Sequence, residues 1–336
     1  MNYCGVDLAG KSSAICIADK AGDDFAECEV ATDEECFDEL FEQLAPTRCL
    51  LEASPLAEWA ARTIEAHGHE AVIIDPRKAK AVVQTKKKTD KLDARNLALM
   101  ARSGWYSAVH RKSPEARLSR TLLGSRRGLV KTALAMSSRI RGLLRAHGIK
   151  LGAVSESEFV GRVREVAQGR CKQLWPMLRP LCAVYLLARK EAEALRKGIK
   201  KATGRDELCR RLMTVPGIGP LTAQAFVATI DDPSRFEDGE KVASYLGLVP
   251  SVHQSGETEY RGRITKDGDD LLRWLLVEAA HVLLTRTKKW CRLKAWGVRL
   301  SRKKGHGKAR VAVARKLAML LHQLWISGEE FNWSQA

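Results

Sequence analysis

NYCGVDL, residues 2–8, is a short apolar segment that predicts a β-strand with Asp7 at its end. A second strand is predicted at 13–19, SAICIAD, and the turn residues between the two segments favour a hairpin. A third strand is predicted at 24–31. The chain is therefore expected to form three strands before its first helix.

The segments that follow alternate between helix and strand patterns. In order, they predict a helix from Thr32-Asp33 to Leu44, a buried strand at 48–54 with Glu52 near its end, a helix from Ser54-Pro55 to His67, and a strand at 69–75. Three strands followed by helix, strand, helix and strand suit a mixed sheet with helices on its faces. The N-terminal fold class is therefore predicted to be α/β.

The chain is strongly basic. Its 336 residues include 57 Lys and Arg against 40 Asp and Glu, which gives a net charge of +17 and a pI near 9.6. This balance favours nucleic acid or an anionic membrane as partner, although general surface basicity would also produce it. No apolar stretch reaches the ~18 residues of a membrane span, and Asp7 and Lys11 interrupt any signal-peptide core, so we expect no membrane association.

The nine cysteines are scattered and form no CxxC pair, which argues against a zinc site. Several lie in apolar runs such as ICIA and CLLE. This pattern is typical of buried thiols in a reducing compartment. We therefore expect a cytoplasmic protein.

The middle of the chain is nearly all helical in pattern. Leucines and arginines interleave along 115–145, a break is predicted at 148–157, and the segment 181–202 is strongly amphipathic. Long antiparallel helices are expected, either as a coiled-coil arm that joins subunits or as a plain helical bundle. The predicted domains are an α/β domain at 1–110, a helical region at 111–204 and a mostly helical domain at 205–336.

Four acidic residues stand out in the first third of this basic chain: Asp7, Glu52, Asp90 and Asp93. The first two end predicted strands, and the last two, spaced i, i+3, share one face of a helix capped by Thr89 or Asp90. Carboxylates that meet at one sheet edge repel each other unless they bind a divalent cation, and hard oxygen ligands select Mg²⁺ or Mn²⁺. The alternative is that Asp7 begins a turn, Asp90 caps a helix and Glu52 is a surface acid, so that the acids share no role.

The segment VPGIGPLTA, residues 215–223, matches a helix-hairpin-helix connection. Gly217 and Gly219 would let backbone N–H groups approach a nucleic-acid phosphate at the start of the second helix. Such contacts do not depend on base sequence. The alternative is a tight turn that only packs two helices together.

A polar, glycine-rich segment at 254–264, predicted as a loop or hairpin, places Ser255 beside a glycine. A serine there could attack phosphorus if cations held the phosphate. The cations that follow closely are Arg261, Arg263 and Lys266. The alternatives are Ser251 as nucleophile, or a loop serine without a role.

Lysine and arginine also cluster in two other places. One is the run Lys86-Lys87-Lys88, just before the helix that carries Asp90. The other is the span 286–316, which holds 13 Lys or Arg and no acid, together with Trp290 and Trp296. Charge neutralisation and base stacking on nucleic acid would use such residues, whereas a solvated helix face is the alternative. The binding candidates here are Lys288, Lys289, Arg292, Arg302, Lys303 and Lys304, and 302–308 is expected to be flexible without nucleic acid.

Several segments, in this order, resemble the insertion-sequence-110 family of DEDD transposases. They are YCGVDLAGKS, LLEAS, IIDPRKAKAVVQTKKKTDKLDARNLA, LMTVPGIGPLTA, ASYLGLVP with the later QSGE, and GRITKDGDDLLRWLLVEAA. The resemblance covers both ends of the chain and is weakest across 110–205. It implies a RuvC-like (RNase H-fold) N-terminal domain, a helical middle and a C-terminal transposase domain with a helix-hairpin-helix.

The resemblance also implies roles for single residues. The serine that in this family is thought to attack a DNA phosphate and form a 5′-phosphoserine link matches Ser255. Asp269 and Asp270 depart from the more usual GRITKxGN pattern, which weakens any basic contact there. The family's acidic tetrad, which binds Mg²⁺, matches Asp7, Glu52, Asp90 and Asp93.

Family members also use a structured non-coding bridge RNA that pairs with donor and target DNA, and the acidic domain of one subunit faces the serine domain of another. We therefore predict a prokaryotic, nucleoid-associated dimer or tetramer that cuts and rejoins DNA. One alternative is a RuvC-like nuclease that resolves branched DNA with metal-activated water. Another is an architectural nucleic-acid-binding protein without catalysis.

Overall fold

The computed structural model describes residues 1–20, 25–75, 89–255 and 258–334. The chain forms two compact units, Met1–Lys112 and Ser113–Ala336. The predicted helical region and C-terminal domain fall within the second unit, so their division at 204 stays a prediction. The run Lys86-Lys87-Lys88 lies outside the described residues. Of the helices that the structure describes, none is both long and apolar enough to cross a membrane.

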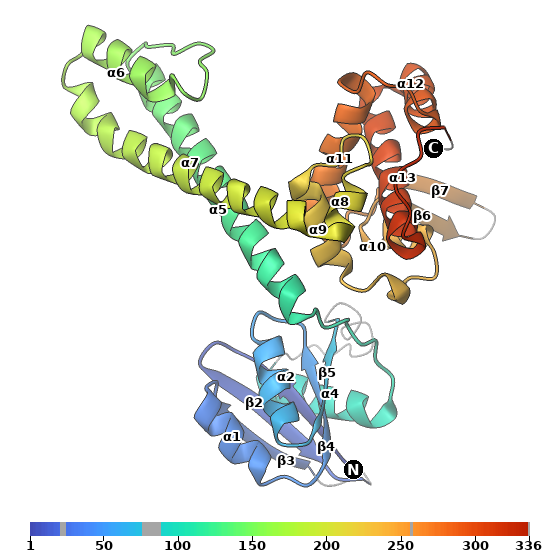
Figure 1. Ribbon diagram of the computed structural model, residues 1–336. Helices are drawn as coiled ribbons and strands as arrows, with labels where there is room; N and C mark the ends of the chain where they lie inside the picture. The colour runs from blue at the N-terminus through green and yellow to red at the C-terminus, as the bar shows by residue number, and fades with distance from the viewer. Residues whose placement is uncertain (21–24, 76–88, 256–257, 335–336) are drawn as a thin grey trace. The chain divides into compact units, whose positions relative to one another are not determined.

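The first unit is built on a five-stranded sheet in the order β3-β2-β1-β4-β5 (Figure 1). The strands are β1 (Asn2–Asp7), β2 (Ser12–Ala18), β3 (Phe25–Ala31), β4 (Thr47–Glu52) and β5 (Glu70–Ile74). The first three pair antiparallel, whereas β1, β4 and β5 run parallel. The predicted mixed sheet is therefore confirmed.

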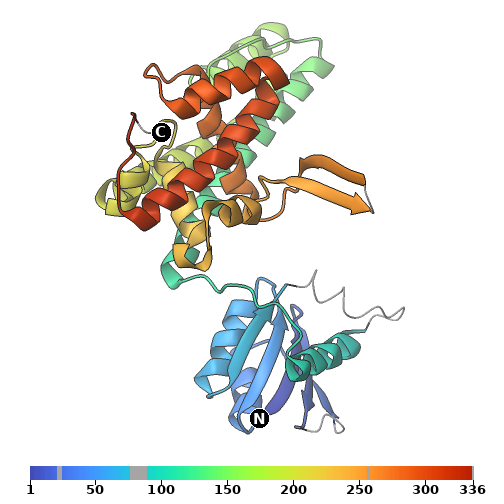
Figure 2. The same ribbon diagram turned by 90° about the vertical axis from the view of Figure 1, so that its right-hand side faces the viewer.

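Helices cover both faces of this sheet, because alternate residues of a strand face opposite sides. On one face, α1 (Glu34–Glu42) and α2 (Ala57–Ala66) bury Phe37 and Ile64 against Cys4 and Val6 of β1. On the other face lies α4 (Asp90–Ser103), which buries Leu97 with residues of β4 and β5 (Figure 2). One predicted detail is wrong: α2 begins at Ala57, and Ser54-Pro55 lie in the preceding turn, so proline is not its first residue.

The helix α4 lies directly on the central strand β1. A Cβ atom at Gly5 would come 1.9 Å from the carbonyl oxygen of Ala94 and 2.5 Å from the backbone nitrogen of Ala98. Only a residue without a side chain allows backbones to approach so closely. The glycine in YCGVD thus fixes how near the helix that carries Asp90 and Asp93 lies to the sheet.

The second unit begins with two long helices packed side by side, α5 (Pro114–Ala146) and α7 (Leu174–Arg205), with α6 (Phe159–Arg170) at their far end (Figure 1). A small core holds that end, in which the rings of Phe159 and Tyr185 lie 4.8 Å apart between centroids. This confirms the long antiparallel helices and the break between them. Pro180 lies within α7 and does not end it.

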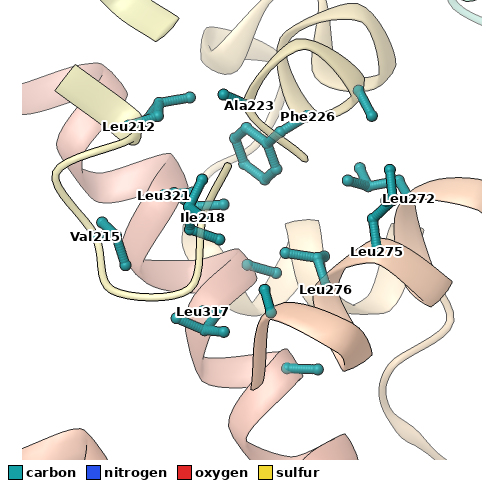
Figure 3. Close-up of a cluster of buried hydrophobic side chains, with 14 of the residues drawn as sticks. Leu212, Val215, Ile218, Ala223, Phe226, Leu272, Leu275, Leu276, Leu317 and Leu321 are labelled. Carbon is teal, nitrogen blue, oxygen red and sulfur yellow. The ribbon is translucent and has the colours of Figure 1, made fainter. Parts of the chain in front are cut away.

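The remainder of the second unit is a helical domain with one hairpin. Its elements are α8 (Glu207–Leu212), α9 (Pro220–Ile230), α10 (Gly239–Tyr245), β6 (Pro250–Ser255), β7 (Thr258–Ile264), α11 (Asp270–Thr285), α12 (Arg292–Lys304) and α13 (His306–Ser327). Figure 3 shows its core, where Phe226, Leu276 and Leu317 from three helices meet with no solvent exposure. Most of the basic span 286–316 lies in α12 and α13, and residues 286–291 precede α12. The prediction that 302–308 is flexible is wrong, because Gly305 alone separates these two helices.

Candidate functional site

Two of the four acids lie at the same edge of the N-terminal sheet. Asp7 is the last residue of β1 and Glu52 the last residue of β4. These neighbouring strands are parallel and pair Val6 with Leu51, so their carboxyl ends meet side by side. Both acids are partly buried.

The other two acids lie in the first turn of α4. Thr89 caps this helix by accepting a hydrogen bond from Leu92 N at 3.3 Å, which decides between the two predicted caps. Asp93 is partly buried and directly precedes Ala94, which lies on Gly5 of β1, whereas Asp90 is exposed. The positive end of the helix favours carboxylates at both positions. The first turn of α4 is thus held on the strand that ends at Asp7.

These acids do not form a closed set of metal ligands in the structure. Within 1–20, 25–75, 89–255 and 258–334, no three His, Cys, Asp or Glu side chains gather closely enough to hold a metal ion. Carboxylate oxygens are nevertheless the donors that Mg²⁺ and Mn²⁺ prefer. The structure therefore brings Asp7 and Glu52 to one edge, and a metal site that uses all four acids stays a prediction.

The predicted serine segment is a β-hairpin. Strands β6 and β7 pair antiparallel from Pro250 with Ile264 to Ser255 with Thr258, so Ser255 ends its strand at the tip. Ser251, the alternative nucleophile, lies at the other end of β6. Its Oγ lies only 2.3 Å from where a Cβ of Gly262 would be, so its hydroxyl packs against the facing strand. The side chains of Ser255 and Arg261 lie outside the described residues.

The base of the hairpin is fixed by a strained turn. Lys266 has a φ of +62°, which side-chain-bearing residues rarely adopt, and its N–H donates to the carbonyl of Gly247 at 3.2 Å. The guanidinium of Arg273 donates to the carbonyls of Leu246 and Asp267 at 3.0 and 2.7 Å and so clamps the two loops together. Arg263 and Lys266 are thus exposed at a base that these hydrogen bonds hold together.

The glycine hairpin between α8 and α9 has a packing role at its first glycine. Gly217 has a φ of +89°, and a Cβ there would come 2.4 Å from the carbonyl oxygen of Ala279 in α11. Val215 and Ile218 on either side are buried in the core (Figure 3). The helix-hairpin-helix form is confirmed, and at Gly217 the tight-turn interpretation explains the glycine. Gly219 precedes α9 with no described atom within 4 Å of a Cβ, so phosphate contact stays a prediction there.

The basic residues of the C-terminal span lie at both ends of α12. Lys288, Lys289 and Arg292 are exposed before and at its start, and Arg302, Lys303 and Lys304 are exposed in its last turn. Lys294 is different: it is buried, and its ammonium donates to the carbonyl of Thr287 and lies 4.5 Å from the ring centroid of the exposed Trp290. The alternation of basic and apolar residues did not reveal this structural lysine.

Asp269 and Asp270, the two departures from the family pattern, are structural. Asp269 caps α11 through Leu272 N at 2.7 Å and pairs with Arg120 of α5 at 2.7 Å. Asp270 accepts two hydrogen bonds from Arg127, at 2.7 and 2.6 Å. The Arg127 guanidinium lowers the pKa of Asp270 to about 2. Sequence reasoning missed these pairs, although the two arginines, seven residues apart, lie on one face of the helix.

Two family models match the two parts of the chain. A transposase model of the DEDD, IS110 type matches residues 4–149, and the model described as Transposase IS116/IS110/IS902 family matches residues 209–295. The transposase for insertion sequence element IS1111A of Coxiella burnetii is 32% identical over 81% of this chain and 75% of its own length. The chain belongs to the IS110-type transposases.

Two other relatives agree. A putative transposase of Sinorhizobium fredii is 29% identical over 88% of this chain and 77% of its own length. A probable family 20 transposase of Pseudomonas aeruginosa is 28% identical over 85% of this chain and 86% of its own length. The chain is therefore an enzyme that cuts and rejoins DNA, and the architectural alternative is set aside.

Proposed function

We propose that this IS110-type transposase cuts and rejoins DNA through a covalent link between Ser255 and a 5′-phosphate. The observation that carries the proposal is the position of Ser255 at the tip of the hairpin, while the hydroxyl of Ser251 packs against Gly262. A nucleophile has to reach a phosphate without obstruction, and a hairpin tip presents its residues to a bulky duplex.

The proposed reaction is a balanced phosphoryl transfer. The Ser255 oxygen forms a bond to phosphorus, the bond to the 3′-oxygen breaks, and the proton of the serine hydroxyl is passed on so that a 3′-hydroxyl leaves. A second attack by a 3′-hydroxyl reverses these steps on another strand and restores the serine. Arg263 and Lys266, which are exposed at the hairpin base, attract the DNA backbone to this segment.

A divalent cation, Mg²⁺ or Mn²⁺, is proposed as cofactor. Asp7 and Glu52 would hold it, with Asp90 and Asp93 from α4 completing the set. Such an ion, when bound, supplies positive charge that stabilises the oxygens of a reacting phosphodiester. The paired strand ends of Asp7 and Glu52 support this assignment.

The proposed partners are donor and target DNA, a bridge RNA that selects the sites, and further copies of this chain in the cytoplasm. The exposed basic residues of α12 would neutralise nucleic-acid phosphates, so we expect affinity to fall steeply with salt. The long pair α5 and α7 exposes large apolar side chains that would pack between subunits as a dimer or tetramer. They include Leu134, Leu143, Val184, Leu186 and Leu187.

The nucleophile is tested by trapping protein on nicked DNA that carries the element ends, in the presence of the bridge RNA. We expect Ser255→Ala to abolish the covalent adduct and leave RNA binding unchanged. The matched control is Ser251→Ala, which removes a hydroxyl from the same strand and should keep the adduct. An adduct that survives Ser255→Ala and disappears in Ser251→Ala would overturn the assignment.

A branched DNA that carries the element ends separates this function from a RuvC-like nuclease, which the neighbouring strand-end acids Asp7 and Glu52 also favour. Metal-activated water would cleave branched DNA and leave no adduct, so cleavage with normal yield in Ser255→Ala would support that alternative. We expect Asp7→Asn and Glu52→Gln each to abolish strand transfer. Full activity in either variant would remove the metal site from the proposal.

A further inference from the structure

A second feature of the hairpin lies at its base rather than its tip. One side of β7 borders an open pocket of about 1000 Å³, which is also lined by Trp296 of α12 and by residues of α10 and α13. Tyr260, Gly262 and Arg263 line it from the hairpin, and Trp296 and Lys316 line it from the helices. This volume is at the upper end of those that hold small organic ligands, and it is too small for a nucleic-acid duplex.

The pocket combines aromatic surface with positive charge. Five basic side chains line it against a single acid, Glu240, which is already paired with Arg315. Trp296 supplies an indole ring, and the ammonium of Lys316 lies 5.1 Å from its centroid. Tyr260 adds a phenol ring with two thirds of its surface exposed. Aromatic faces beside cations are what an unstacked base and its phosphate need.

The bound base must lie outside a duplex, because neighbouring bases stack on both faces of a base inside a duplex. The ligand is therefore an unpaired nucleotide. The identity of the strand follows from the proposed function: the pocket and Ser255 belong to one hairpin, and the strand that Ser255 attacks is DNA.

The distance between the two sites follows from strand geometry. Ser255 pairs with Thr258, and the pocket begins two residues further along β7, at Tyr260, and continues to Ile264. At about 3.3 Å per residue, the pocket lies roughly 7–20 Å from the hairpin tip. At the ~3.4 Å rise of a DNA strand, this corresponds to about two to six nucleotides.

We propose that this pocket holds one unpaired nucleotide of the DNA strand that Ser255 attacks, a few nucleotides from the cleaved phosphate. The proposal rests on the proposed function for the identity of the strand. Trp296 stacks on the base, and Lys308 and Lys316 of α13 contact the flanking phosphates. Capture of this nucleotide fixes the register of the strand relative to the serine.

The test compares two DNA duplexes that differ only in one bulged 2-aminopurine nucleotide. The wild-type protein should bind the bulged duplex more tightly than the fully paired one and quench the fluorescence of the base. Trp296→Leu should weaken binding of the bulged duplex by about 5- to 100-fold and abolish the quenching. Trp296→Phe, which keeps an aromatic ring, should retain most of both.

Trp274→Leu is the matched control, because Trp274 of α11 is exposed and lies outside the pocket lining. It should keep the preference for the bulge. Trp296 also packs against the core, so a second variant avoids it. Lys308→Ala combined with Lys316→Ala changes exposed side chains only and should remove the preference for the bulge. The pair Lys303→Ala and Lys304→Ala should weaken binding of both duplexes equally.

Three results would overturn the proposal: an unchanged preference in the Trp296→Leu and Lys308/Lys316 variants, an equal loss in Trp274→Leu, or tighter binding of a bulged RNA duplex. The assay needs no cleavage, so it is independent of the serine. A normal adduct on Ser255 with no bulge preference would leave the proposed function intact and remove this inference. A preference for the bulge without any adduct would keep the pocket as a nucleotide site and remove the proposed function.

Discussion

At the scale of single residues, short contacts explain why two positions require glycine. Gly5 is needed because α4 lies on it, and Gly217 is needed because the hairpin turns with positive φ against α11. Burial raises the pKa of the Cys16 thiol to about 11 and that of Cys209 to about 12, so both stay protonated at neutral pH. The expected buried thiols are confirmed for six of the nine cysteines, and the other three are partly exposed.

We expect Gly5→Ala to destabilise the first unit strongly. A methyl group there would overlap the carbonyl oxygen of Ala94, and relief requires that α4 move away from β1. Overpacking of this kind typically costs about 1–3 kcal/mol, and the backbone contact puts this site at about 3 kcal/mol or above. Urea unfolding followed by circular dichroism measures the change.

The control for this prediction is Gly10→Ala, because no described atom lies within 4 Å of a Cβ at Gly10. It should change the free energy of unfolding by about 0.5 kcal/mol or less. Equal effects at both positions would mean that α4 does not rest on Gly5.

At the scale of elements, helices are tied to each other by caps and ion pairs. Arg120 and Arg127 of α5 bind the N-cap residue and the first residue of α11, Asp269 and Asp270, and this joins the long helical pair to the helix that follows the serine hairpin. The periodicity of the sequence predicted both helices but not their contact. Partners about 143 residues apart are brought together only by the packing of the unit.

The pair between Asp270 and Arg127 makes a pH-dependent contribution to stability. Arg127 lowers the folded pKa of Asp270 to about 2, below the ordinary value near 4. A lowered carboxyl pKa stabilises the fold above the unfolded pKa, and the contribution is lost as pH falls from about 4 through 2. The Asp270 side chain is 66% exposed, so solvent screening limits the effect at pH 7 to about 1 kcal/mol or less.

This contribution is measured as the difference in urea stability between wild type and Asp270→Asn from pH 3 to pH 7. We expect the difference to shrink as pH falls below 4. In an Arg127→Gln background the difference should be small at every pH. A difference that grows on acidification would contradict the assignment of the pKa shift to Arg127.

At the scale of the molecule, the acids and the serine of the predicted site belong to different units of the chain. Asp7 and Glu52 belong to Met1–Lys112, and the serine hairpin and the α12 cations belong to Ser113–Ala336. The family resemblance predicts that the acids and the serine of one active site come from different chains. In the proposed oligomer, the exposed apolar side chains on α5 and α7 would join those chains.

We expect the double substitution Leu186→Glu with Leu187→Glu to lower the oligomer mass measured by light scattering. These leucines are 51% and 59% exposed on α7, and burying two glutamates in an interface is unfavourable. Lys190→Glu on the same helix is the control, since it alters the net charge by the same amount and leaves the apolar surface intact. Equal dissociation in both would indicate a charge effect, and no dissociation in either would place the interface elsewhere.

Local patterns were enough to predict most elements, the mixed sheet and the family, because strand alternation, helix periodicity and turn residues are local and the family motifs are contiguous. They also placed Asp7 and Glu52 at strand ends, where parallel pairing brings them together. Long-range packing instead determines that α4 lies on Gly5, that most of the basic span lies in α12 and α13, and that Trp296 and the hairpin line one pocket. Those outcomes depend on which surfaces pack together across long stretches of chain, and no local pattern encodes the partner of a surface.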